Sequence, residues 1–244
     1  MKFINIGAFF DIDGTLYREG LIKEIFKKLI RYDIIDESLW SSEVKPHYEK
    51  YDKRIGNYDN YLIKMADIYA SAIKGMNKIQ LEFIAKKVVE QKGDKVYAFT
   101  RDRINFHKSL GHMTFTISGS PEELVKEMSI KHGFDHYIGS NYLTDDKNIY
   151  TGEIIPMWNS KNKLNALIEF SKEYDIDLSK SYAYGDTSGD FSMLKAVGNP
   201  TVINGTKELL ELLLGNEITK DKINIIVERK DVIYKINKDS LDFK

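Results

Sequence analysis

Residues 9–16 read FFDIDGTL, and two of them, Asp11 and Asp13, are the strongest clue to the architecture of the chain. Lys2 to Phe10 leads into them; it is rich in β-branched and aromatic side chains and predicts a short buried strand. In an extended chain, residues i and i+2 point the same way, so the two carboxylates repel each other unless a cation or a shared proton compensates. Gly14 then lets the chain turn away. The stretch alone fits equally well a catalytic or metal site and an Asx-type turn.

Helical periodicity begins just after this stretch. Apolar side chains recur at helical spacing through residues 20–91, for example at Leu21 and Ile25, and no convincing strand interrupts them. The second half alternates short strands with amphipathic helices. The expected strands are 113–117, 137–138, 181–184, 201–203 and 223–227, the last two closing the series; the expected hairpin is 142–155, and the expected helices are 121–132, 163–174 and 191–196. Ser120 is expected to cap the first of these helices, with Pro121 in its first turn.

Strands that alternate with helices predict an α/β fold with a doubly wound, Rossmann-like parallel sheet. We expect residues 1–18 and 93–244 to form this core domain, and residues 19–92 to form a helical domain inserted after the first strand. Ligands of such sheets bind beyond the carboxyl ends of the strands. The chemistry is therefore expected at the strand ends.

The composition is that of an ordinary soluble protein. The 244 residues are 42% hydrophobic and 30% charged, with a net charge of -1. No apolar run predicts a membrane span or a secretory signal, and the spread of lysine and arginine predicts no nucleic-acid partner. Cysteine is absent, which excludes disulfides, thiolate catalysis and cysteine-type zinc sites. We expect a cytoplasmic location, with which this composition is compatible.

Two further strand ends carry polar side chains. Residues 185–190 read GDTSGD, and residues 118–120 read SGS. Taken alone, Asp186 or Ser188 could simply cap the helix that follows. The order of these features along the chain is more informative. An acidic strand end comes first, followed by a helical insertion, a hydroxyl-bearing strand end, a lysine-led helix and a second acidic strand end.

A calcium-binding loop is excluded by spacing. Such a loop needs glycine at its sixth position and glutamate at its twelfth. Counted from Asp11, these positions hold Leu16 and Ile22, and a loop beginning at Asp186 has Phe191 in place of the glycine.

This order of motifs resembles the haloacid dehalogenase (HAD) superfamily of phosphatases. Residues 9–16 are similar to its first motif, residues 116–120 to the second, Lys163 to the third and residues 185–190 to the fourth. The resemblance covers nearly the whole chain. The helical insertion between the first two motifs is similar to a C1-type cap of subfamily I, and residues 118–124 with the following hairpin favour the branch that contains phosphoserine phosphatases.

The resemblance implies a role for each carboxylate. Asp11 would attack phosphorus and form an aspartyl-phosphate. Asp13 would protonate the leaving oxygen and then take a proton from the attacking water. Mg²⁺ is the implied cofactor, bound by the Asp11 carboxylate, the Asp13 backbone carbonyl and the Asp186 carboxylate.

The remaining motif residues are implied to bind phosphate. Ser118 and backbone N–H groups near Gly119 would hold its oxygens, and Lys163 would supply positive charge. Asp190 would orient Lys163 or a metal-bound water. Lys161 is the alternative lysine; we prefer Lys163 because the apolar side chains after it would then pack the helix against the sheet.

The sequence departs from the family pattern at two places. Gly189 stands where the family often has asparagine, so a contact to metal-bound water or phosphate is absent or supplied elsewhere. A phosphoserine site of this family needs a cap glutamate and a cap arginine. Glu19 lies one residue before the expected place, where Gly20 stands, and Met65, preceded by Lys64, occupies the arginine position. An ammonium cannot give the bidentate fork of a guanidinium.

We therefore predict a Mg²⁺-dependent phosphatase whose partner is a small organic phosphate monoester of open identity, with no nucleic-acid or membrane partner. Phosphoserine phosphatase proper and a phosphotransferase or mutase of the same superfamily are the enzymatic alternatives. A non-catalytic phosphate- or partner-binding protein is the alternative from another class.

Overall fold

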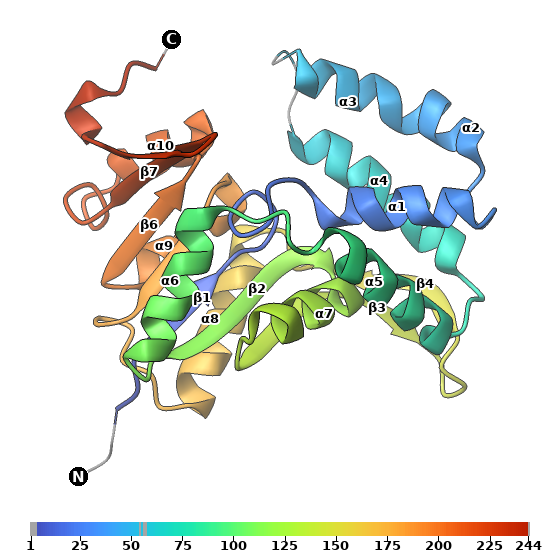
Figure 1. Cartoon of the computed structure of the whole chain (residues 1–244), viewed down its shortest axis with the longest axis horizontal. Coiled ribbons are helices and arrows are strands. Elements are labelled where there is room, and N and C mark those ends of the chain that lie inside the picture. The colour runs from blue at the N-terminus through green and yellow to red at the C-terminus, as the bar shows by residue number, and fades with distance from the viewer. Residues whose placement is uncertain (1–3, 54, 56–57, 244) are drawn as a thin grey trace.

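The computed structural model describes residues 4–53, 55 and 58–243, and only the backbone of residues 58–60. Lys2 and Phe3, where the first expected strand begins, lie outside the described residues. The strands are β1 (Gly7–Phe10), β2 (Met113–Pro121), β3 (His136–Thr144), β4 (Tyr150–Ile155), β5 (Tyr182–Gly185), β6 (Asn199–Ile203), β7 (Asn224–Arg229) and β8 (Val232–Ile236). They form one sheet in the order β4-β3-β2-β1-β5-β6-β7-β8, shown in Figure 1.

The centre of the sheet is parallel. Strand β1 pairs in parallel with β2 on one side and with β5 on the other, and the pairs β2–β3, β5–β6 and β6–β7 are also parallel. The two edge strands, β4 and β8, are antiparallel to their neighbours. The predicted Rossmann-like α/β fold is confirmed, and the strand that begins the chain lies in its middle.

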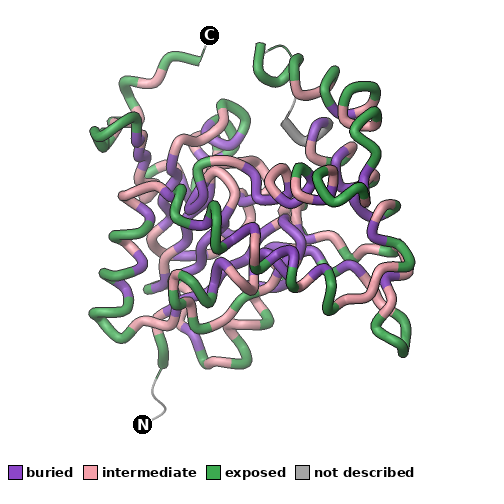
Figure 2. The backbone as a smooth tube through the Cα atoms, turned by 45° about the vertical axis from the view of Figure 1, so that its right-hand side comes forward, coloured by how far each residue is buried: buried purple, intermediate pink, exposed green. Residues whose placement is uncertain are grey.

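Helices cover both faces of the sheet. The helices of the core are α6 (Ala98–Ser109), α7 (Glu122–His132), α8 (Ser160–Glu173), α9 (Phe191–Ala196) and α10 (Lys207–Leu214). Successive residues of a strand face opposite sides, so Phe10 packs into the apolar cluster that contains residues of α6 and α7, and Phe9 into the one that contains residues of α8, α9 and α10. Buried backbone accordingly runs through the middle of the molecule in Figure 2.

A second group of helices lies at one end of the sheet, at the right in Figure 1. It comprises α1 (Leu21–Arg31), α2 (Glu37–Leu39), the π-helical turn Trp40–Val44, α3 (Lys45–Asp52), α4 (Tyr58–Ile73) and α5 (Lys78–Lys92). The two connections to the core are hydrogen-bonded to each other, from Arg18 N–H to Lys95 O (3.0 Å) and from Tyr97 N–H to Leu16 O (2.9 Å).

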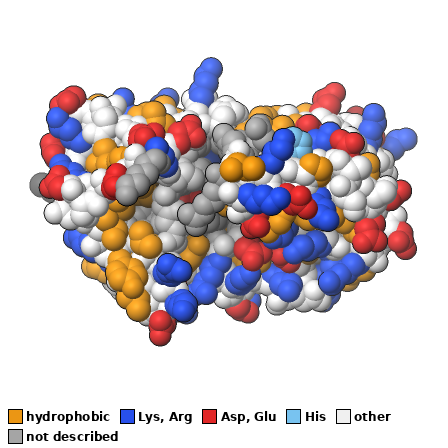
Figure 3. Space-filling view, turned by 90° about the horizontal axis from the view of Figure 1, so that it is seen from above, with side chains coloured by type: hydrophobic (Ala, Val, Ile, Leu, Met, Phe, Trp, Pro, Cys, Tyr) orange, Lys and Arg blue, Asp and Glu red, His pale blue; other side chains and the backbone are white. Residues whose placement is uncertain are grey.

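The absence of strands that we expect between residues 20 and 91 is confirmed for the described part of that range, where Asn77 makes an isolated bridge to Ile149. Among the described residues, no helix is long and apolar enough to cross a bilayer. Acidic and basic side chains are interspersed over the face of the molecule shown in Figure 3.

The predicted hairpin is present as β3 and β4, and Asp145 orders its turn by accepting hydrogen bonds from the N–H groups of Lys147 and Ile149. Two other expectations are wrong. Residues 223–227 do not form the last strand, because β8 follows through a turn in which Lys230 has a φ of 57°. Ser120 does not cap α7: β2 extends to Pro121, and the Ser120 hydroxyl bonds elsewhere.

Candidate active site

The acidic side chains of the first and last motifs meet because their strands are neighbours. Phe10 of β1 is paired with Tyr184 of β5, and the N–H of Asp11 donates to Tyr184 O at 3.0 Å. Asp11 and Asp186 thus leave the same edge of the sheet side by side. Asp190, in the 3-10 turn after β5, joins them: one carboxylate oxygen from each of the three aspartates lies within 4.8 Å of the others.

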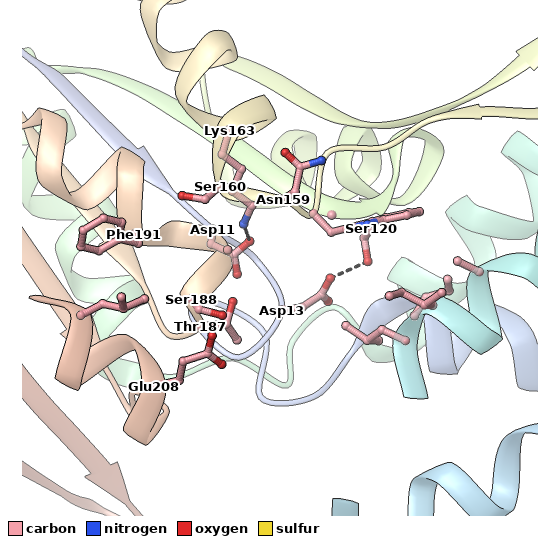
Figure 4. Close-up of a pocket in the computed structure, with 18 residues that line it drawn as sticks. Asp11, Asp13, Ser120, Asn159, Ser160, Lys163, Thr187, Ser188, Phe191 and Glu208 are labelled. Carbon is pink, nitrogen blue, oxygen red and sulfur yellow. Dashed lines mark hydrogen bonds and ion pairs between the residues drawn. The ribbon is translucent and has the colours of Figure 1, made fainter. Parts of the chain in front are cut away.

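Lys163 reaches this cluster from α8. Its Nζ lies 2.6 Å from Asp11 Oδ1 and 2.6 Å from Asp190 Oδ1, and its side chain is only 4% exposed. The contact with Asp11 is drawn in Figure 4. Burial lowers the pKa of Lys163, but the two carboxylates outweigh burial and raise it above its ordinary value, so the ammonium stays charged. Lys161, the alternative lysine, is exposed.

Helix α8 begins before Lys163, so this lysine does not open the helix. Asn159 caps it by accepting a hydrogen bond from Asn162 N–H at 2.9 Å, and the helix starts at Ser160. Lys163 lies one turn inside the helix, at a position that points to the strand ends.

Lys163→Met is expected to lower the free energy of unfolding by about 3–5 kcal/mol in a metal-free buffer, because two buried carboxylates lose their cation. The measurement is urea unfolding at neutral pH. Lys161→Met is the matched control and should change the stability by no more than about 0.5 kcal/mol. Equal effects of the two substitutions would contradict the placement of Lys163.

Asp190 is fixed on both sides. Its Oδ1 accepts from Lys163, and its Oδ2 accepts the N–H groups of Asp186 and Thr187 at 3.0 and 3.1 Å. With both oxygens engaged, Asp190 orients Lys163 and the loop that carries Asp186. All three carboxylates lie close enough together to hold a cation, and those of Asp11 and Asp186 make fewer hydrogen bonds than that of Asp190.

Asp186 approaches the first motif closely. Its Oδ1 accepts from the Thr15 hydroxyl at 2.9 Å. Gly14 has a φ of +84°, and a Cβ at this position would overlap Asp186 Oδ2. The glycine therefore serves two purposes, a left-handed turn and room for a carboxylate. Burial, together with the neighbouring Asp11 and Asp190, raises the pKa of Asp186 well above its ordinary value.

The Asp13 side chain points away from this cluster. Its Oδ1 accepts from Leu21 N–H at 2.7 Å, at the start of α1, and its Oδ2 accepts from the Ser120 hydroxyl at 2.5 Å (Figure 4). Burial raises the pKa of Asp13, while the hydrogen bonds from Ser120 and Leu21 oppose the rise. This contact between Ser120 and Asp13 was not predicted from the sequence.

The other residues of the second motif lie beside this pair. Ser118 is fully buried, and its Oγ accepts from Ser120 N–H at 3.2 Å and lies 3.5 Å from Asp13 Oδ2. Gly119 and Ser120 line the cavity described next. The structure thus brings together all of the side chains that the motifs single out, with Ser118 set back from the cavity surface.

A cavity of about 420 Å³ opens over these groups. Asp11, Asp13 and Lys163 lie on its lining, and Figure 4 shows the core side chains on one side facing those of α4 on the other. Asn159 and Ser160, at the start of α8, add polar groups, and much of the remaining lining is apolar: Ile22, Leu62, Ile63, Ala66, Trp158, Phe191 and Leu212. Thr187, Ser188, Gly189 and Glu208 contribute the polar edge near α10.

Two glycines make room for Trp158. A Cβ on Gly119 would lie 2.9 Å from Trp158 Cβ, and a Cβ on Gly189 would lie 2.5 Å from the Trp158 carbonyl oxygen. Any side chain at position 189 would therefore displace the backbone of Trp158. Gly189, which stands where the family often has asparagine, is therefore in close contact with a tryptophan on the cavity wall. No local sequence pattern predicts this contact.

A buried cluster of three carboxylates and one lysine lies at the carboxyl ends of parallel strands, where ligands of such sheets bind. The family model of haloacid dehalogenase-like hydrolases matches residues 8–195, and the chain belongs to this family.

The chain is also similar to individual proteins of known sequence or structure. The chain is 25% identical over 204 residues to the "Inhibition of morphological differentiation protein" of Streptomyces azureus, covering 83% of this chain and 73% of the relative. It is 23% identical over 207 residues to a histidinol-phosphatase of Neisseria meningitidis, covering 83% and 91% of the two chains. The fold is similar to that of a substrate-bound phosphoserine phosphatase, with a TM-score of 0.60 and 21% identity over 94% of this chain and 96% of that one.

Proposed function

We propose that this protein is a Mg²⁺-dependent phosphatase that hydrolyses a small phosphate monoester through an aspartyl-phosphate on Asp11. The observation that carries the proposal is the position of the Asp11 carboxylate, which lies on the floor of the cavity with one oxygen 2.6 Å from Lys163 Nζ and another carboxylate, Asp186, close by. A phosphatase-named relative supports the same reaction class.

The donor set fits Mg²⁺. When all three are ionised, Asp11, Asp186 and Asp190 place three negative charges in a buried cluster where Lys163 supplies one positive charge, so a bound cation would stabilise their ionised forms. Hard oxygen donors suit Mg²⁺. The carboxylates of Asp11 and Asp186 and the backbone carbonyl of Asp13 would hold it, and it would neutralise charge between the nucleophile and the phosphate.

The reaction is then carried by side chains of this chain. Asp11 attacks phosphorus, and the bond from phosphorus to the ester oxygen breaks. Asp13, whose raised pKa favours the protonated form, donates a proton to the departing oxygen. Asp13 next removes a proton from a water molecule that attacks the aspartyl-phosphate, which restores Asp11 and releases phosphate. Lys163 and the N–H groups near Gly119 stabilise the phosphate oxygens throughout.

We further propose that helices α1 to α5, residues 19–92, act as a C1-type cap over the core formed by residues 1–18 and 93–244. The cavity lining supports this division, since Ile22, Leu62, Ile63 and Ala66 cover the site from the helical side. A cytoplasmic location stays a prediction.

The proposal is tested by incubating purified protein with p-nitrophenyl phosphate in the presence of Mg²⁺ and again after chelation. Release of free phosphate that stops on chelation and returns with Mg²⁺ is the expected result. Transfer of the phosphoryl group to an added alcohol, without release to water, would favour the phosphotransferase alternative. Absence of turnover with every ester would favour a non-catalytic binding protein.

Mg²⁺ affinity is expected to rise with pH. Burial raises the pKa of Asp11 to about 8, so below that pH the metal-free site holds a proton that Mg²⁺ must displace. For each proton released, the apparent affinity should increase by about tenfold per pH unit between about pH 6 and pH 8, and then level off. Isothermal titration calorimetry in buffers of different ionisation enthalpy measures both affinity and protons released; an affinity independent of pH would refute the expectation.

A further inference from the structure

We propose that the alcohol part of the substrate is apolar and carries no carboxylate, and that it binds between α4 and the core residues Trp158 and Phe191. This inference rests on the proposed function and specifies the substrate class for the same site. Three features of the cavity lead to it: the apolar side that faces the nucleophile, the charges around it, and the position of Trp158.

The helical side of the cavity is apolar. Leu62, Ile63 and Ala66 of α4 line it, and their spacing places them along one face of the helix. Ile22 of α1 adds to the same wall. These four are the described cavity-lining residues that α1 to α5 contribute, so the alcohol part of a bound ester meets hydrocarbon opposite Asp11.

The charges around the cavity oppose a second anionic group. Of the described side chains on the lining, Lys163 is the one cation, and two carboxylates already hold it. The remaining charged lining groups are the carboxylates of Asp11, Asp13 and Glu208. A carboxylate on the substrate would lose hydration here without gaining a cationic partner among the described lining residues, and it would be repelled by the carboxylates already present.

A phosphoserine site of this family needs a cap glutamate and a cap arginine, and the residues at or near those two positions make other contacts in this protein. Met65, at the position where the family's arginine is expected, is buried in the apolar core. Lys64 forms an ion pair with Glu43 at 2.7 Å, and Glu19 forms one with Lys95 at 2.5 Å. None of these five residues is on the cavity lining.

Trp158 completes the apolar subsite from the core. Its backbone is seated against Gly119 and Gly189, and Trp158 and Phe191 both line the cavity from the core. Two glycines that sit in the phosphate-binding motifs therefore also determine where this aromatic wall stands. An apolar alcohol of the size of a phenyl or butyl group gains contact on both sides, and each buried methylene contributes about 0.8 kcal/mol.

The test compares alkyl phosphates whose leaving groups are similarly basic: phenethyl phosphate and butyl phosphate against phosphoserine and phosphoglycolate, with phosphoethanolamine as the cationic member. Phenethyl phosphate is expected to have a kcat/KM at least about tenfold above that of phosphoserine, and the difference should lie mainly in KM. The serine alkoxide leaves no less readily than the phenethyl alkoxide, so intrinsic reactivity does not favour this result.

Ile63→Arg makes the test specific to the cavity wall. Ile63 lines the cavity and is 44% exposed, so an arginine can be accommodated without disturbing the core. The new cation should raise the ratio of phosphoserine to phenethyl phosphate turnover by about tenfold. Ile79→Arg, on α5 at a position 70% exposed and outside the cavity, is the matched control and should leave the ratio unchanged.

Phosphoserine or phosphoglycolate turned over as well as phenethyl phosphate would overturn the inference and leave the phosphatase intact. The inference would also be overturned if the ratio of phosphoserine to phenethyl phosphate turnover were the same in Ile63→Arg as in Ile79→Arg. If none of the esters, p-nitrophenyl phosphate included, is hydrolysed in Mg²⁺, the proposed function itself fails and the inference fails with it.

Discussion

Asp11→Asn is expected to lower kcat for p-nitrophenyl phosphate by on the order of 10⁵-fold, the scale seen when a covalent nucleophile is removed. An amide oxygen is neutral and a weak nucleophile, and the substitution also removes one anionic ligand of the proposed Mg²⁺ site. The side chain keeps its shape, so Asn at this position can still accept from Lys163. Loss of activity would then report on chemistry rather than on unfolding.

The decisive measurement combines steady-state turnover with acid-quenched protein. A phosphorylated peptide that contains residue 11 should be found in the wild-type protein and be missing from the variant. Asp11→Ala guards against residual activity from deamidation of the asparagine. Asp146→Asn makes the same aspartate-to-asparagine change on the exposed turn of the β3–β4 hairpin. It is the matched control and should retain full turnover. Activity within tenfold of wild type in Asp11→Asn would exclude Asp11 as the nucleophile.

Asp13→Asn is expected to reduce kcat by about 10³–10⁴-fold while Mg²⁺ binding changes little. The reason is geometric: the Asp13 carboxylate points to Ser120 and to the N–H of Leu21, away from Asp11 and Asp186. Its proposed contact with the metal is the backbone carbonyl, which the substitution retains. Asparagine can still accept from Leu21 and donate to Ser120, so the connection between β2 and α1 should persist.

This variant should behave differently with different leaving groups. An ester with an acidic alcohol needs little help to depart, so Asp13→Asn should still form the aspartyl-phosphate from p-nitrophenyl phosphate but hydrolyse it slowly. Rapid-quench experiments should show a burst of p-nitrophenol followed by a slow phase. A large loss of Mg²⁺ affinity, measured by calorimetry, would contradict the separate roles of the carboxylate and the carbonyl.

The sequence predicted the parts of the fold in which local pattern and tertiary environment agree. The strands before Asp11 and Asp186 are short and apolar because both of their faces are covered, and they were recognised from that composition. Strand β8 escaped recognition because its side chains are almost all exposed, so burial left no pattern in the sequence. Helices α6 and α10 were likewise not predicted.

Some residues of the candidate site could be predicted from the sequence and others could not. Asp11 and Asp186 could be named from the order of the acidic strand ends along the chain, and Lys163 from the apolar side chains that follow it in an amphipathic helix. Ser120 was assigned to a helix cap because serine before proline and glutamate is typical of one; its actual partner, Asp13, is 107 positions away. Trp158 belongs to no motif. Trp158 could be singled out only because its backbone lies close to Gly119 and Gly189 in the folded protein. A single sequence does not show which distant segments approach each other so closely.

The central place of β1 in the sheet has a consequence for biosynthesis. Strand β1, which positions Asp11, is synthesised before one of its two neighbours, β5: Gly7 N–H donates to the hydroxyl of Ser181, 174 positions further along. Until that late segment has been synthesised and docked, Asp11 lacks its hydrogen bond to Tyr184 as well as its neighbours Lys163 and Asp190. Contacts of such long range form slowly. A chain that ends before Ser181 therefore carries Asp11 without these neighbours, and the candidate site is complete only after β5 has docked beside β1.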